Sequence, residues 1–103
     1  MSLELDPEDA FEAVLIDMAE TARRKGRDYA QDGNRWSNFI ESGSQTGLAP
    51  SQVAEVLIAV KQARLKALRE NGRTPENESV EDTMIDRAVY SVIAIVLART
   101  VDG

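Results

Sequence analysis

Two basic residues, Lys61 and Arg64, lie three positions apart in a segment with helical periodicity. At 3.6 residues per turn they share one stripe of a helix with Leu57 and Leu68, so neither is expected on a fully solvated face. Such a pair can clamp a phosphate or a carboxylate. Alternatively, the long stems cover apolar surface while the charged ends reach water. The spacing therefore predicts either an anion clamp or cations that cover the core.

Two carboxylates, Asp82 and Asp86, are four positions apart, and Tyr90 continues the same stripe. Like charges at this spacing repel each other along a helix, so we expect a counter-charge or a metal ion nearby. One interpretation is a magnesium site, because Mg²⁺ prefers oxygen ligands. In the other, Asp82 caps the helix and Asp86 pairs with Lys61 or Arg64. We predict that one of these basic residues lies within salt-bridge distance of one of the two carboxylates.

The polar stretch KGRDYAQDGNRWSNF, residues 25–39, holds three of the five aromatic residues of the protein. One interpretation is that these rings fold the stretch over the helices and close the core. In the other, an arginine and an aromatic ring hold a planar base and its phosphate. The candidate ligand-binding residues of this stretch are Lys25, Arg27, Asp28, Tyr29, Arg35 and Trp36.

Composition removes several classes of chemistry. The chain has no cysteine and no histidine, which excludes disulfides, zinc fingers and Ser-His-Asp catalysis. The net charge is -6 and the pI is about 4.6, so we expect no bulk binding to nucleic acid or to an anionic membrane. Any catalysis would depend on carboxylates, Lys, Tyr, Ser or a metal ion held by oxygen ligands.

The charge is distributed unevenly along the first third of the chain. Seven acidic residues and no basic residue occupy positions 1–20, whereas positions 23–35 hold five basic residues and two acidic ones. Basic residues at the end of a helix complement its dipole, which gives the second group a structural interpretation. A local basic patch is the alternative. Its members are Arg23, Arg24, Lys25, Arg27 and Arg35.

The positioning elements are three long helices, predicted near residues 7–25, 50–71 and 79–101. Asp6 and Pro7 form a start signal for the first helix, and Gly26 is expected just beyond its end. Asn71 marks the end of the second helix, and Ser79 caps the third. A short helix is expected around residues 35–42. The residues expected to form one buried stripe on the first helix are Phe11, Val14, Leu15, Met18, Ala19 and Ala22.

The third predicted helix is apolar on every side in its second half, AVYSVIAIVLA at residues 88–98. A helix of this kind must lie at the centre of the fold or meet another subunit. Three helices leave little protein to surround it, so we expect a homo-oligomer of a single all-α domain, residues 1–103. The apolar run is too short to span a membrane, which needs about 20 residues. Residues 1–20 lack an apolar signal region, and we expect a soluble cytoplasmic protein.

The segments KGRDYAQDGNRWSNF, LIAVKQARL and EDTMIDRAVY together resemble a family of small uncharacterised bacteriophage-encoded proteins. Its pattern is K-x-x-D-Y-G and N-F, then K-x-x-R, then D-x-x-x-D-x-x-x-Y. Ala30 stands where the family has glycine. The resemblance implies the cytoplasm of a host cell but brings no activity with it. The residues that match are Lys25, Asp28, Tyr29, Asn38, Phe39, Lys61, Arg64, Asp82, Asp86 and Tyr90.

A more distant similarity is to the all-α nucleotide pyrophosphatases of the MazG type. Those proteins are oligomeric helical bundles that bind magnesium through paired carboxylates, which implies Asp82 and Asp86 as metal ligands. This chain departs from their pattern, because Lys61 and Arg64 stand where a second carboxylate pair would be needed.

Two hypotheses follow. The first is a helical binding or assembly module whose polar cluster is structural or binds a small anion or nucleotide. The second is a magnesium-dependent nucleotide pyrophosphohydrolase. Carboxylates that line an open cleft would favour the enzyme, and carboxylates that are engaged by Lys or Arg would favour the module.

Overall fold

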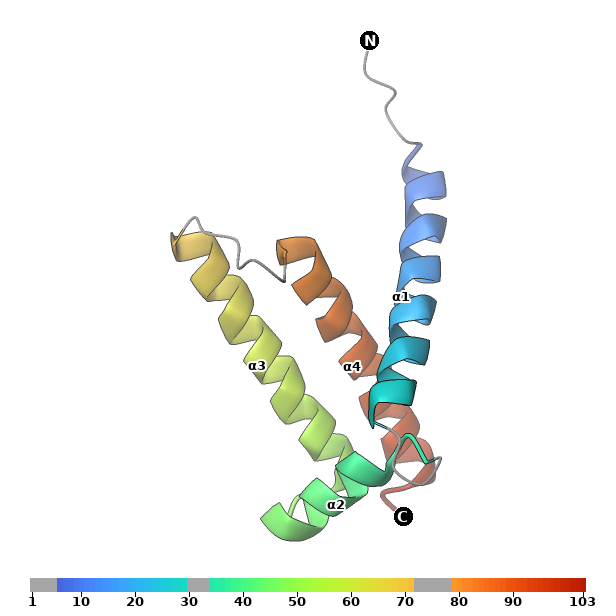
Figure 1. The fold of residues 1–103 in the computed structure, drawn as a ribbon, viewed down its shortest axis with the longest axis vertical. Helices are drawn as coiled ribbons and strands as arrows, with labels where there is room; N and C mark the ends of the chain where they lie inside the picture. The colour runs from blue at the N-terminus through green and yellow to red at the C-terminus, as the bar shows by residue number, and fades with distance from the viewer. Residues whose placement is uncertain (1–5, 30–33, 72–78) are drawn as a thin grey trace.

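The computed structural model describes residues 6–29, 34–71 and 79–103, and over these residues the fold is all-α (Figure 1). The helices are α1 (Pro7–Tyr29), α2 (Ser37–Thr46), α3 (Pro50–Asn71) and α4 (Val80–Thr100). None of the described ranges contains a β-strand, so the all-α fold class is confirmed. No helix among these residues is long and apolar enough to cross a membrane.

Helix α4 lies at the centre of the arrangement. It packs most extensively against α3, which runs in the opposite direction, and it also contacts α1, which runs in the same direction (Figure 1). Helix α1 diverges from α4 toward its own N-terminus and extends beyond the start of α4, while α2 crosses the other end of the bundle (Figure 1). The central position predicted for the third long helix is therefore confirmed.

The core forms where α2, α3 and α4 meet. Its buried members are Phe39 from α2, Ala54 from α3, and Tyr90 and Leu97 from α4, with Trp36 packed against them. Burial of a Phe or Leu side chain contributes about 2 kcal/mol through its apolar area. The interpretation that the aromatic residues close the core is thus confirmed for Trp36 and Phe39.

The predicted end of the first helix was wrong. Helix α1 continues through Gly26 to Tyr29. This glycine makes room for a side chain from the next segment. A Cβ atom at Gly26 would lie 1.8 Å from Nη2 of Arg35, and the same nitrogen donates a hydrogen bond to the carbonyl oxygen of Ala22 at 3.1 Å. The glycine serves a close approach in the tertiary structure and not a helix end.

The predicted burial of the first-helix stripe was also wrong for the N-terminal half of α1. Phe11 is 61% exposed, and Val14 and Leu15 are exposed as well, whereas Met18 is partly buried. The reason is the divergence of α1 from α4, which leaves that half without a neighbouring helix among the described residues (Figure 1).

Candidate functional site

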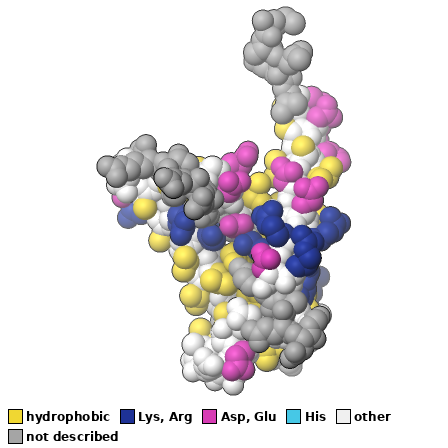
Figure 2. All heavy atoms as spheres, in the orientation of Figure 1, with side chains coloured by type: hydrophobic (Ala, Val, Ile, Leu, Met, Phe, Trp, Pro, Cys, Tyr) yellow, Lys and Arg dark blue, Asp and Glu magenta, His cyan; other side chains and the backbone are white. Residues whose placement is uncertain are grey.

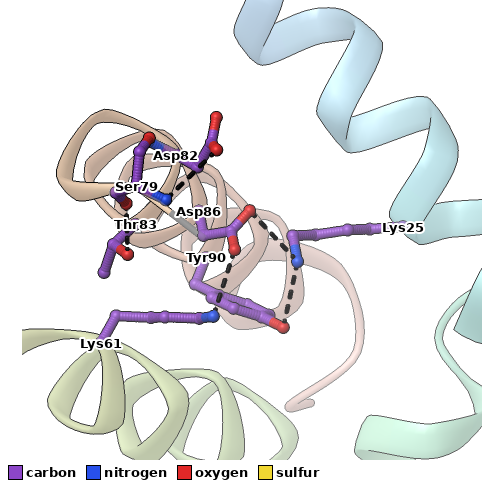
Figure 3. Close-up of polar contacts among 7 residues, drawn as sticks. All are labelled: Lys25, Lys61, Ser79, Asp82, Thr83, Asp86 and Tyr90. Carbon is purple, nitrogen blue, oxygen red and sulfur yellow. Dashed lines mark hydrogen bonds and ion pairs between the residues drawn. The ribbon is translucent and has the colours of Figure 1, made fainter. Parts of the chain in front are cut away.

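The central residue of the polar site is Asp86, which lies on α4 between lysines from the two flanking helices (Figure 3). Its Oδ2 atom is 3.1 Å from Nζ of Lys61 on α3, and its Oδ1 atom is 3.4 Å from Nζ of Lys25 on α1. The predicted pairing of Lys61 with Asp86 is therefore confirmed. One carboxylate links three helices, because each of its oxygens faces a different lysine.

Tyr90 lies one turn further along α4 and completes the group, which we call the Asp86 cluster: Lys25, Lys61, Asp86 and Tyr90 (Figure 3). Nζ of Lys25 donates a hydrogen bond to Oη of Tyr90 at 3.4 Å and lies 4.7 Å from the centre of the tyrosine ring. The second distance is within the range of a cation–π interaction. Because Tyr90 is buried, Lys25 connects α1 directly to the core.

The charged members of the cluster are largely removed from water. The side chains of Lys25, Lys61 and Asp86 are 13%, 17% and 17% exposed. A charge in such a place is costly unless an opposite charge compensates it. The cluster therefore stabilises the packing of α1 and α3 on α4 only as a unit.

Asp82 has a different role. It forms a capping box at the start of α4, in which its backbone N–H donates to Oγ of Ser79 at 3.0 Å and its Oδ2 accepts from the backbone N–H of Ser79 at 3.4 Å (Figure 3). This agrees with the interpretation in which Asp82 caps the helix and Asp86 pairs with a lysine. Within the described ranges, no three acidic side chains gather closely enough to hold a metal ion.

Several other predicted site residues lie outside the Asp86 cluster. Arg64 is about one turn beyond Lys61 on α3, and its side chain is exposed. Arg27 and Asp28 are exposed on the last turn of α1. The side chain of Tyr29 lies outside the described part of the structure.

Arg35 and Trp36 form a second contact between the connector and α1. The Arg35 guanidinium lies 5.4 Å from the centre of the Trp36 ring, and its hydrogen bond to Ala22 fixes it across Gly26. The cavity beneath these side chains, which Phe39 also lines, has a volume of about 20 Å³. That is room for about one water molecule and not for a planar base. Arg35 and Trp36 also line a wider depression of about 350 Å³ between α1 and α4.

The sequence did not point to a contact between the end of the chain and the start of α3. Oδ1 of Asp102 accepts a hydrogen bond from the backbone N–H of Ser51 at 3.0 Å, and Oδ2 accepts from the Ser51 hydroxyl. A carboxylate at a helix N-terminus is favoured by the helix dipole. No local pattern could have indicated it, because the two residues are 51 positions apart.

Comparisons with protein-family models, with curated proteins and with solved structures found no significant match. The functional inference therefore depends on the geometry of the chain itself.

Proposed function

We propose that the protein is a helical assembly module that associates with further copies of itself through α1 and α4. In this proposal the Asp86 cluster is structural, and it fixes the C-terminal half of α1 to the α3–α4 pair. The observation that carries the proposal is a groove between α1 and α4 that is lined mainly by apolar side chains. We call it the α1–α4 groove, and its main members are Val14, Leu15, Met18, Met84, Val92 and Val96.

The groove is too apolar for an ordinary water-exposed surface. It consists of two adjoining depressions of about 350 and 600 Å³, which share Met18. Val92 is 49% exposed, and its neighbour Ile95 on α4 is 52% exposed. Single exposed apolar residues are normal, whereas a contiguous patch of this kind is typical of an interaction site. A second chain is expected to cover it.

The contacts of Asp82 and Asp86 also favour an assembly module over an enzyme. Asp86 is engaged by two lysines, and Asp82 is engaged by the backbone at the start of its own helix. A magnesium-dependent pyrophosphohydrolase would need carboxylate oxygens that are free to bind the ion. Asp86 offers such oxygens only by giving up a contact to a lysine, and Oδ2 of Asp82 is already engaged in the capping box.

One additional role is the binding of a small anion or of a nucleotide phosphate by Lys25 and Lys61, whose ammonium groups both lie beside Asp86. A thermal-shift series with inorganic phosphate and with nucleotides, each with and without magnesium, tests this role. A ligand at 100 times its dissociation constant should stabilise the fold by about 2.7 kcal/mol. An unchanged melting temperature throughout the series would leave assembly as the only proposed role.

Light scattering on matched variants tests the assembly. Val92→Asp places a charge in the α1–α4 groove, and Val60→Asp places one on α3 at a residue that is 50% exposed. We expect the wild-type chain and Val60→Asp to have a multiple of the single-chain mass of 11.3 kDa, and Val92→Asp to have that mass itself. Equal masses for all three proteins would contradict the proposal.

A further inference from the structure

Apart from Asp28 on the last turn, the acidic and basic residues of α1 are separated along its length. Figure 2 shows acidic side chains on the N-terminal half of this helix and basic side chains on its C-terminal part. All of them except Lys25, which belongs to the Asp86 cluster, are exposed. The acidic members before Arg23 are Glu8, Asp9, Glu12, Asp17 and Glu20, the exposed basic members are Arg23, Arg24 and Arg27, and one acid, Asp28, follows them.

Helix α4 has the same polarity. Its first turn carries Glu81 and Asp82, and its last turn carries Arg99. Because α1 and α4 run in the same direction (Figure 1), both helices are acidic toward one end of the α1–α4 groove and basic toward the other. Their helix dipoles are likewise aligned.

We propose that two copies of this chain pair across the α1–α4 groove in an antiparallel orientation, related by a two-fold axis. The inference rests on the proposed function and specifies its geometry. A parallel pairing would place acid against acid and base against base, whereas an antiparallel pairing places each acidic end against a basic end. Opposite charges at the rim of an interface set its orientation, and like charges there oppose association.

The apolar residues of α1 define the register. The stripe runs from Phe11 to Ala22, so a two-fold axis at its middle lies between Ile16 and Asp17. This places Leu15 opposite the second copy's Met18 and brings Glu12 near the second copy's Arg23. The apolar residues of one α1 helix then pack on those of the other, and Glu12 and Arg23 pair along the side of the apolar stripe, which we call its flank.

Helix α1 provides a long face for this pairing. It has 23 residues, which at 1.5 Å per residue is a length of about 34 Å. Helix α4 widens this face only beside the C-terminal half of α1, where the two helices are in contact (Figure 1). A face about 10 Å wide on α1, with half that area added by α4, is roughly 500 Å² on each partner, or about 1,000 Å² in total, which is the lower bound expected of a specific interface.

Cysteine crosslinking tests the orientation, because the chain has no cysteine of its own. With the axis at the middle of the stripe, the two copies of residue 15 are about 4.5 Å apart along the helix, and the two copies of residue 11 are about 16 Å apart. A short bismaleimide should therefore join Leu15→Cys chains to one another and should fail with Phe11→Cys alone. A mixture of Phe11→Cys with Ala22→Cys should crosslink.

The crosslinking results distinguish a wrong orientation of the two copies from a failure of the chain to associate with itself. Efficient crosslinking of Phe11→Cys to itself would show a parallel pair and overturn the inference, and so would an oligomer that crosslinks at neither position. A chain that remains at the single-chain mass would instead overturn the proposed function.

A charge exchange at the flank provides a second readout. Glu12→Arg and Arg23→Glu should each weaken dimerisation by roughly tenfold, which corresponds to about 1.4 kcal/mol, because each creates like-charge contacts. The double variant should restore wild-type association, since it exchanges the two charges. In a parallel pair neither single change would alter the number of like-charge contacts, so unchanged dimerisation in both would overturn the inference.

Discussion

Replacement of Asp86 by alanine tests whether the Asp86 cluster holds the fold together. The change removes the carboxylate that both Lys25 and Lys61 contact, and the side chains of these lysines are 13% and 17% exposed. Stranding a buried charge costs about 3–5 kcal/mol. Lysine stems are flexible and both ammonium groups retain some access to water, so we expect a loss near the lower end, about 3 kcal/mol.

Urea denaturation followed by circular dichroism measures this loss. In thermal denaturation of a chain of this size, 1 kcal/mol corresponds to roughly 4–8 °C, so the expected decrease in melting temperature is about 12–24 °C. Glu55→Ala, which removes an exposed acid from α3, is the control and should change stability by no more than about 0.5 kcal/mol. Lys61→Met should cost much less in the Asp86→Ala background than in the wild type, because the contact between Lys61 and Asp86 is already absent. If Asp86→Ala were as stable as the control, the structural role of the cluster would be refuted.

Two further predictions concern the ends and contacts of helices. Gly26→Ala should change the free energy of unfolding about 1 kcal/mol more favourably in an Arg35→Ala background than in the wild type, because alanine is the better helix former once the guanidinium no longer occupies the space. Urea denaturation measures both changes. Equal effects in the two backgrounds would contradict the proposed role of the glycine. Ser79→Ala should destabilise the protein by about 1 kcal/mol through loss of the capping box. Ser91→Ala, on the exposed surface of the same helix, is the control and should not destabilise it. Similar stabilities of the two variants would contradict a stabilising role of the capping box.

The sequence predicted the helices well where the signals were local. Pro7 and Ser79 marked the starts of α1 and α4, because capping involves only neighbouring residues. Gly26 misled the prediction, because its lack of a side chain serves Arg35, which approaches from outside the helix. Local signals cannot distinguish a glycine that ends a helix from one that admits a tertiary contact.

The candidate site was predictable in part for a similar reason. Lys61 and Asp86 each share a stripe with apolar residues, so both had to face the bundle, and opposite charges there had to compensate each other. The same argument placed Arg64 beside Lys61, yet Arg64 is exposed, because the exact rotation of α3 depends on its packing against α4. The exposure of Phe11 and Leu15 was not predictable either, since periodicity indicates an apolar face but not the chain that covers it.

Hydrogen exchange of the N-terminal half of α1, measured as a function of protein concentration, tests assembly through the α1–α4 groove most directly. In a single chain this half of the helix has few contacts and its amides should exchange quickly, whereas a second copy in the groove should protect them. We predict that protection of residues 8–16 increases with concentration in the wild type and is low in Val92→Asp. Fast exchange in the wild type that does not change with concentration would contradict the central claim.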